Sequence, residues 1–330
     1  NCNIKTEKPS LSIPPLISEH ISANHQKSTL LTTTPVISLR TDWNGTNFLS
    51  GSYNHAFHFT INSFESTKQR YSIPIAPPDK ANSFCRCACF HPSDVLIGVS
   101  KDTSIYLYDI SSLLQQDEMV LNRCPFLLST LPNLHKYPIT GLTFSPNGSH
   151  FVTSSLDSTI KTVDLMKSKT VYDITLKNQI TSLDSSPNGQ FVGATTSNGD
   201  LIIFDDRQEG NLFTIAAHKS WASTLTFSQY GSIVATGGSD KSINLFDLRQ
   251  PSDPAQLFRL HRPYGTPNSI SFDSSDRLWC GTSFGELYAF QLDNAQNIFS
   301  MNINAHKTFT NNEIDDFSPI YSVLYVKSNE

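Results

Sequence analysis

The chain has 330 residues, of which 38% are hydrophobic and only 16% are charged, and its formal net charge is −5. This length is enough to bury a sizeable core, and the negative charge excludes a bulk electrostatic attraction to nucleic acid or to an anionic membrane. Much of the remaining composition is Ser, Thr and Asn, which is typical of short, half-buried strands joined by polar turns. No apolar run approaches the ~20 residues of a membrane span, and no signal peptide is visible.

The chain begins with a segment bearing Pro and Ser, residues 1–34, which contains one candidate strand at residues 28–33. After it a sequence template recurs, with its clearest copy at residues 139–148, Ile-Thr-Gly-Leu-Thr-Phe-Ser-Pro-Asn-Gly. The sixth position of the template is aromatic in most copies. In chain order the copies have Thr41, Phe90, Phe144, Ser185, Phe227, Phe272 and Tyr325 at this position. The shorter of these spacings match the ~40–45 residues of a four-stranded propeller blade.

Each copy of the template is followed by a second strand, a tight turn, a third strand and an edge strand. Residues 234–240 and 243–248 form the clearest second and third strands. This regular spacing, without a convincing helical period, predicts a closed all-β array. We expect a β-propeller over residues 35–330, with six recognisable blades and a partial seventh that begins at Ile320. Either the sequence is truncated, which is the favoured interpretation, or a partner completes the seventh blade.

The ends of the third strands resemble the WD-repeat family. The family's Trp-Asp ending takes the form of an apolar or aromatic residue before Asp, at Tyr108-Asp109, Val163-Asp164, Phe204-Asp205 and Phe246-Asp247. The family's Gly-His pair survives as Ala217-His218. The resemblance covers roughly residues 35–330, and it implies a propeller that serves as a platform for protein–protein contacts.

The resemblance also implies a structural role for polar residues that look catalytic in isolation. In the family, a His, a hydroxyl residue and a turn Asp form a buried hydrogen-bonded chain. The residues that match are His218, Thr236 and Asp240, with Asp157 and Asp102 as further turn aspartates. Because a tight turn needs its amides capped and buried polar atoms need partners, we expect these residues to stabilise the fold.

Two motifs suggest chemistry but are better explained by structure. Residues 281–285, Gly-Thr-Ser-Phe-Gly, fit the nucleophile elbow of hydrolases, but that chemistry needs a strand-to-helix turn, and here a hairpin between strands is predicted. Cys85, Cys87 and Cys89 alternate along one apparent strand with no second pair, which favours buried thiols over a zinc site. Such a layout also fits a reducing, intracellular setting better than a disulfide framework. We expect no enzymatic activity, no cofactor and no metal.

Loops that lead into four blades place a cation beside an aromatic residue. By family resemblance these loops lie on one face, where partners commonly dock, and Arg, Trp and Tyr are the usual anchors of interfaces. The candidate partner-binding residues are Tyr53, Arg86, Lys101, Lys136, Tyr137, Lys219, Trp221, Arg262, Tyr264 and Lys307. The alternative is that these are ordinary solvated loop residues that follow a structural His.

Two blade endings are similar, Phe204 to Arg207 and Phe246 to Arg249. Residues 234–249 resemble the sixteen-residue box of WD-repeat substrate receptors of cullin ubiquitin ligases, and residues 192–207 match it less well, with Asn198 where the box has Asp. In such a role Asp205, Arg207, Asp247 and Arg249 would contact an adaptor, with each Arg paired to a carboxylate of the adaptor. The same ending also occurs in WD-repeat proteins without a ligase role, where the Arg braces neighbouring strands.

The sequence therefore predicts a non-enzymatic scaffold or adaptor subunit of a complex in the cytoplasm or nucleus, with protein partners on the basic and aromatic loop face. A cullin-ligase substrate receptor is one alternative. The other is an RNA-binding propeller that uses the same face for base stacking and for Lys and Arg contacts.

Overall fold

The computed structural model describes 23 strands, β1 to β23, which form six antiparallel sheets. The described residues are 36–41, 47–53, 57–63, 69–74, 87–111, 126–205, 207, 212–249, 254–259, 265–272, 277–283 and 287–291. The structure thus confirms the all-β prediction.

Five sheets contain four consecutive strands each, and the last sheet contains three. The first three sheets comprise β1 (Val36–Thr41), β2 (Asn47–Tyr53), β3 (Phe57–Ser63) and β4 (Gln69–Pro74); β5 (Ala88–Phe90), β6 (Leu96–Lys101), β7 (Ser104–Asp109) and β8 (Phe126–Leu131); and β9 (Ile139–Phe144), β10 (His150–Ser155), β11 (Thr159–Asp164) and β12 (Lys169–Thr175). The other three comprise β13 (Ile180–Ser185), β14 (Val192–Thr196), β15 (Asp200–Phe204) and β16 (Leu212–Ala216); β17 (Ala222–Phe227), β18 (Ile233–Gly238), β19 (Ser242–Asp247) and β20 (Pro254–Arg259); and β21 (Pro267–Phe272), β22 (Arg277–Thr282) and β23 (Leu287–Gln291).

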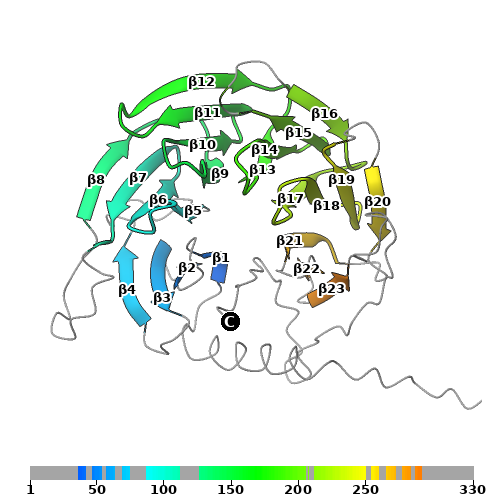
Figure 1. The fold of residues 1–330 in the computed structure, drawn as a ribbon, viewed down its shortest axis with the longest axis horizontal. Helices are drawn as coiled ribbons and strands as arrows, with labels where there is room; N and C mark the ends of the chain where they lie inside the picture. The colour runs from blue at the N-terminus through cyan, green and yellow to red at the C-terminus, as the bar shows by residue number, and fades with distance from the viewer. Residues whose placement is uncertain are drawn as a thin grey trace, which may run out of the picture.

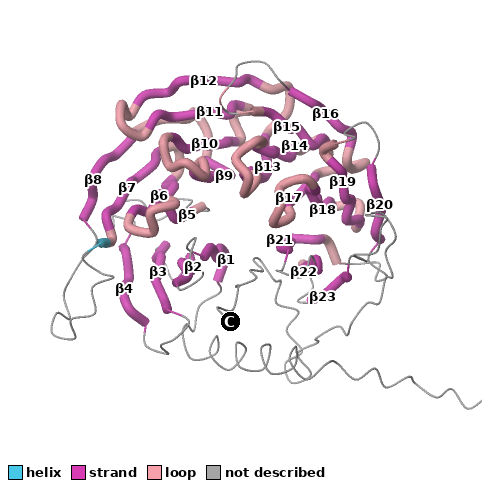
Figure 2. The backbone as a smooth tube through the Cα atoms, in the orientation of Figure 1, coloured by secondary structure: helices cyan, strands magenta, loops and turns pink. Residues whose placement is uncertain are grey.

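The six sheets follow one another around a common centre (Figure 1). The first strand of each sheet lies nearest the centre, and the last strand lies toward the rim, as the tube in Figure 2 also shows. Successive inner strands are in contact, from β1 with β5 through to β17 with β21. This arrangement is a β-propeller in which each sheet is one blade.

The six described blades agree with the six predicted from the repeat. Figure 1 shows the first and sixth blades on either side of an opening in the ring of described strands. The candidate strand at residues 28–33 and the predicted start of a seventh blade, with Ile320, Val323 and Tyr325, lie outside the described residues. The predicted boundary between residues 1–34 and 35–330 stays a prediction.

The turn between the first and second strands of a blade explains the Ser-Pro-Asn-Gly part of the template. In the third blade the amide of Gly148 donates to the carbonyl of Ser145 over 2.8 Å. Gly148 has a φ of +72°, which L side chains rarely adopt. A Cβ atom there would also lie 2.5 Å from the Nε2 atom of His91 in the preceding blade. Glycine is therefore required by both the backbone and the neighbouring blade.

The hydrophobic core lies between neighbouring blades. One cluster joins Ile105 and Leu107 from β7 to Leu142 and Phe144 from β9, and all four side chains are buried. Because adjacent blades cover both faces of the third, fourth and fifth sheets, the second strands of these blades are buried almost throughout, their Ser and Thr residues included. Neighbouring blades approach closely at Gly141 in β9, where a Cβ atom would lie 2.3 Å from the Cβ atom of Leu183.

Candidate protein-binding face

One face of the propeller carries the loops that lead into the inner strands and the turns between second and third strands. We call it the loop face and define it by loops 132–138, 176–179 and 217–221 with turns 102–103, 156–158, 197–199 and 239–241. Main-chain hydrogen bonds hold each loop to the turn beside it. The amide of Leu156 donates to Pro138 over 3.1 Å, and the amide of Ser239 donates to Trp221 over 2.8 Å. The loops are therefore anchored at their inner ends.

A buried polar network stabilises the loop face in the fifth blade. The Nδ1 atom of His218 lies 3.0 Å from Oδ1 of Asp240, and its Nε2 atom lies 3.0 Å from the hydroxyl of Thr236. The hydroxyl of Ser242 donates to the same carboxylate over 2.6 Å. The second carboxylate oxygen of Asp240 accepts the amide of Lys219 over 3.2 Å. The carboxylate thus joins the core of the blade to the loop that carries Lys219.

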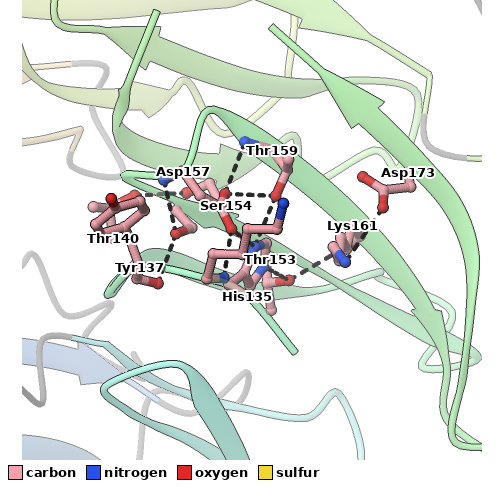
Figure 3. A network of polar contacts seen from close by, with 11 residues as sticks. His135, Tyr137, Thr140, Thr153, Ser154, Asp157, Thr159, Lys161 and Asp173 are labelled. Carbon is pink, nitrogen blue, oxygen red and sulfur yellow. Dashed lines mark hydrogen bonds and ion pairs between the residues drawn. The ribbon is translucent and has the colours of Figure 1, made fainter. Parts of the chain in front are cut away.

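The third blade repeats the same arrangement (Figure 3). The Nε2 atom of His135 lies 2.9 Å from the hydroxyl of Thr153, and its Nδ1 atom lies 2.9 Å from the hydroxyl of Thr159. The carboxylate of Asp157 accepts the amide of Lys136 over 2.8 Å and the hydroxyl of Thr159 over 2.6 Å. Two blades therefore present their loop lysines on the same polar support.

Burial decides the charge of the two histidines. It lowers the pKa of His135 and of His218 below the usual value, although the adjacent aspartate acts in the opposite direction. Burial by itself raises the pKa of Asp240. The hydrogen bond from the Ser242 hydroxyl, the nearby His218 and the amide of Lys219 outweigh it, so this pKa lies below its usual range. At neutral pH the network combines a neutral imidazole with an ionised carboxylate.

Asp102 occupies a different position from the other two predicted turn aspartates. Lys101 pairs with Ser104, which leaves a two-residue turn between β6 and β7. Asp102 itself has a φ of +50°, whereas in the third blade the residue after the aspartate, Ser158, takes the left-handed conformation with a φ of +67°. The carbonyl of Asp102 accepts the amide of Ile139 over 2.8 Å, which ties this turn to the next blade.

Several predicted partner-binding side chains are exposed on the loop face. Tyr137 is 61% exposed and Trp221 is 43% exposed, while Lys136 and Lys219 are also exposed and Lys101 is half-buried. The side chain of Tyr53 and the residues Arg86, Arg262, Tyr264 and Lys307 lie outside what the structure describes.

Lys177 was not among the partner-binding residues predicted from the sequence. It is exposed in loop 176–179, which leads into β13 just as the loops with Lys136 and Lys219 lead into β9 and β17. This loop carries no His, so the cation-after-His pattern did not identify it. Its position before the inner strand of the template was the signal that could have found it.

Four lysines on or next to the loop face make no ion pair with a described residue. In the part of the chain that the structure describes, no ion pair involves Lys101, Lys136, Lys177 or Lys219. The carboxylate of Asp240, which lies closest to Lys219 in the network, is already bonded to main-chain and side-chain donors. No described carboxylate therefore neutralises these four ammonium groups.

Two arginines on the opposite face are paired within their own turns. That face carries the turns between first and second strands and between third and fourth strands. The guanidinium of Arg207 donates to both carboxylate oxygens of Asp205 over 2.8 and 2.9 Å. Arg249 makes the equivalent bidentate contact with Asp247, at 3.0 and 2.8 Å. These hydrogen bonds hold the pKa of each aspartate below its usual range. The guanidinium groups thus contact their own turn aspartates.

Other candidate chemistry finds a structural explanation. Gly281 and Thr282 end β22, which pairs with β23 in an antiparallel hairpin, whereas Phe284 and Gly285 of the motif lie outside the described residues. Cys87 is a half-buried free thiol and Cys89 a buried one, whereas Cys85 lies outside the described residues. Among the described residues no group of three His, Cys, Asp or Glu side chains is arranged to hold a metal ion. Nor do they contain a helix long and apolar enough to cross a membrane.

A family model for the WD domain, G-beta repeat, matches residues 127–164, 169–205 and 210–247. Residues 127–247 thus contain three WD repeats within a β-propeller fold. Each matched repeat begins at an outer strand and ends with the third strand of the next blade, so the WD repeat is offset from the blade by one strand. The solved structure entitled "Structure of U3-55K" aligns with a TM-score of 0.69 at 15% identity, over 88% of this chain and 85% of that chain. At this identity the likeness shows the fold alone.

Curated relatives of this WD-repeat chain match it in part. Pre-mRNA-processing factor 19 of Dictyostelium discoideum is 28% identical over 37% of this chain and 24% of the relative. Ribosome biogenesis protein YTM1 of Pyricularia oryzae is 26% identical over 52% and 41%, respectively. COMPASS component SWD1 of Saccharomyces cerevisiae is 30% identical over 34% and 26%. The matches to three pre-mRNA-processing factor 19 sequences span 24% to 30% of those relatives' length.

The WD-repeat network here works without the tryptophan of the family's Trp-Asp ending. Val163 and Phe246 stand at that position and are fully buried. The hydroxyl of Thr153 instead donates to the carbonyl of Lys161 over 3.3 Å. The hydroxyl of Thr236 donates to the carbonyl of Asn244 over 3.4 Å. A main-chain acceptor on the third strand therefore completes the network in both blades.

Proposed function

We propose that this chain is a non-enzymatic scaffold subunit of an intracellular complex, and that it binds an acidic segment of a protein partner across the loop face. The observation that carries the proposal is the difference between the two faces. Lys136 and Lys219 on the loop face make no ion pair with a described residue and lie with exposed Tyr137 and Trp221. On the opposite face Arg207 and Arg249 are bound to their own aspartates.

The two kinds of side chain have complementary tasks in this proposal. The loop-face lysines Lys136 and Lys219 attract a partner of opposite charge and set its orientation, which raises the rate of association more than the affinity. Exposed aromatic side chains supply affinity, because Trp and Tyr bury much area at little entropic cost. The carboxylates of Asp157 and Asp240 accept the amides of Lys136 and Lys219, which holds the main chain of both lysines in place before binding.

The names of the relatives support a role as a subunit. The relatives are named for pre-mRNA processing, for ribosome biogenesis and as a COMPASS component. The cullin alternative has less support, since Arg207 and Arg249 already contact the carboxylates of Asp205 and Asp247. The RNA alternative uses the same lysines and aromatic residues, so an experiment must separate it from protein binding.

A charge-reversal experiment tests the proposal. The double variant Lys136→Glu and Lys219→Glu is compared with a matched double variant, Lys167→Glu and Lys169→Glu, which changes two exposed lysines away from the loop face. Proteins that co-purify with each tagged full-length chain are quantified by mass spectrometry, with and without ribonuclease. We expect a discrete set of proteins to be lost from the first variant, retained by the second and unaffected by ribonuclease. An unchanged set overturns the proposal, and loss of the set with ribonuclease replaces it with the RNA alternative.

A further inference from the structure

Three consecutive blades carry a lysine at the same place on the loop face. Lys136, Lys177 and Lys219 each lie three residues before the first residue of an inner strand, which is β9, β13 and β17, respectively. The loops that contain these lysines differ in length and in sequence, so loop length does not explain the shared position. The third, fourth and fifth blades therefore present a row of three cations.

Main-chain hydrogen bonds fix the loop on both sides of each lysine. On one side, the residue before the lysine donates its amide to a turn of the preceding blade. These pairs are His135 with Thr103, Leu176 with Ser158 and His218 with Gly199, at 3.2, 2.8 and 2.8 Å. On the other side, the last residue of the loop accepts an amide from the turn of its own blade. These pairs are Pro138 with Leu156, Gln179 with Ser197 and Trp221 with Ser239, at 3.1, 2.8 and 2.8 Å. The main chain of the three lysines is therefore held in equivalent positions.

The central lysine of the row, Lys177, is exposed and makes no ion pair with a described residue. The two turns that hold its loop and the two flanking loops all lie among the described residues. The first of these turns contains Asp157, whose largely buried carboxylate accepts the amide of Lys136. The second has Asn198 at the equivalent position, and Asp200, which follows it, forms no ion pair within the described part of the chain. A partner therefore meets exposed ammonium groups along the row.

The distance between neighbouring blades sets the spacing of the row. β9 contacts β13 and β13 contacts β17, and the three inner strands follow one another in Figure 1. Since packed sheets lie ~10 Å apart, a segment that reaches all three lysines needs acidic side chains at intervals of roughly 10 Å on one side. The polyproline II helix, with ~3.1 Å per residue and three residues per turn, brings every third side chain to the same side at intervals of ~9 Å. In an extended β-strand, side chains three residues apart point to opposite sides.

An α-helix requires a longer segment for the same match. Its residues seven positions apart lie on one face at ~10.5 Å, so about fifteen residues are needed to reach three lysines, and isolated helices of that length are marginal. In the polyproline II conformation about seven residues suffice, and this preformed helix docks on surfaces lined by aromatic side chains. Tyr137 and Trp221 are such side chains, exposed beside the first and the last lysine of the row.

We propose that the third to fifth blades bind a partner segment in the polyproline II conformation that has an acidic residue at every third position. Its carboxylates meet Lys136, Lys177 and Lys219 in turn, and the prolines between them pack against Tyr137 and Trp221. The long, flexible lysine side chains follow the curvature of the ring. The inference rests on the proposed function, because it concerns the same face, and it adds the conformation and the register of the acidic segment.

Labelled synthetic peptides test the register. The first peptide has glutamate at its first, fourth and seventh positions with prolines between them. The second has the same composition with its three glutamates adjacent, and the third is the first with glutamine in place of glutamate. A fourth, alanine-based peptide has glutamate at its first, eighth and fifteenth positions. Fluorescence anisotropy measures their binding to the full-length chain, and we expect the first peptide to bind at least about fivefold more tightly than each of the others.

The outcomes separate the inference from the proposed function. Equal binding of the first two peptides, both tighter than the glutamine peptide, overturns the register but leaves a face that selects acidic segments. Tighter binding of the fourth peptide than of the first overturns the polyproline II conformation in the same way. If no acidic peptide binds more tightly than the glutamine peptide, the inference is overturned, and the charge-reversal co-purification decides the proposed function separately.

A charge swap tests the central contact. Lys177→Glu should weaken binding of the first peptide by about fivefold or more, whereas Lys169→Glu, at an exposed lysine on the outer strand β12, should leave it unchanged. Both variants should keep the melting temperature of the wild-type chain. A version of the first peptide with lysine in place of its central glutamate should bind Lys177→Glu more tightly than it binds wild type. Equal loss in the two variants, or no recovery with the swapped peptide, overturns the inference.

Discussion

The Nδ1 atom of His218 lies 3.0 Å from a carboxylate oxygen of Asp240, and the other oxygen of that carboxylate accepts the amide of Lys219. Asp240 therefore connects the buried imidazole to the loop that presents Trp221. The same connection, with His135, Asp157 and the amide of Lys136, is present two blades earlier. The stability of the blade and the conformation of its loop depend on one carboxylate.

Removal of this carboxylate should destabilise the fold. We expect Asp240→Ala to lower the free energy of unfolding by roughly 1–3 kcal/mol, because it leaves buried donors without an acceptor. Urea denaturation measures the effect. Asp200→Ala, at the start of β15, removes a carboxylate that makes no hydrogen bond or ion pair among the described residues and should change stability by less than about 0.5 kcal/mol. Equal midpoints for Asp240→Ala and wild type would exclude Asp240 from a stabilising role.

Stability should fall as the pH is lowered from 7 to 5. Burial holds the pKa of His135 and His218 in the folded protein below 6.5, the value of an unperturbed histidine. Below pH 6.5 the unfolded chain therefore binds more protons than the folded chain, and the free energy of unfolding decreases by at most about 1.4 kcal/mol per pH unit for each histidine. Denaturation at pH 7, 6 and 5 measures the slope. His218→Gln should have a shallower slope over this range, and a slope unchanged from wild type would contradict the assignment.

The three described cysteines should differ in how fast they react with a thiol reagent. Burial raises the pKa of the Cys89 thiol far above its usual value, and the same holds for Cys280 in β22. Since the thiolate is the reactive form, both should resist iodoacetamide at pH 8 in the folded protein and react after denaturation. Cys87, which is half-buried, should react sooner. Mass spectrometry of the peptides follows each site, and native labelling of Cys89 as fast as that of Cys87 would show that the inner strand opens.

Trp221 should contribute to binding more than to stability. Its side chain is 43% exposed, and its contact with Ser239 uses only the main-chain carbonyl, which survives substitution. We expect Trp221→Ala to lose loop-face partners, by ~2 kcal/mol or more of binding energy, while the melting temperature stays within a few degrees. Phe213→Ala, at a side chain 49% exposed on the outer strand β16, is the matched control. If Trp221→Ala unfolds, or retains every partner, the binding site has been misplaced.

The amino-acid sequence by itself determined the blade. The template at residues 139–148 contains the alternation of an inner strand and a turn that ends in glycine, and these are local properties that do not depend on the rest of the chain. The recurrence of that template predicted a propeller because a single four-stranded blade cannot bury both of its faces alone. The hydrogen-bonded group of His218, Thr236 and Asp240 followed from resemblance, and its residues are within bonding distance of one another.

The tertiary structure alone decided which charges are available. Arg207 and Arg249 looked available for a partner in the sequence, but the turn at the end of the third strand brings each guanidinium onto its own aspartate. Lys177 became part of the loop face only when loop 176–179 was placed beside the loops of the adjacent blades. Pairing and exposure depend on distances between side chains that are far apart in the chain, and only packing of the blades sets those distances.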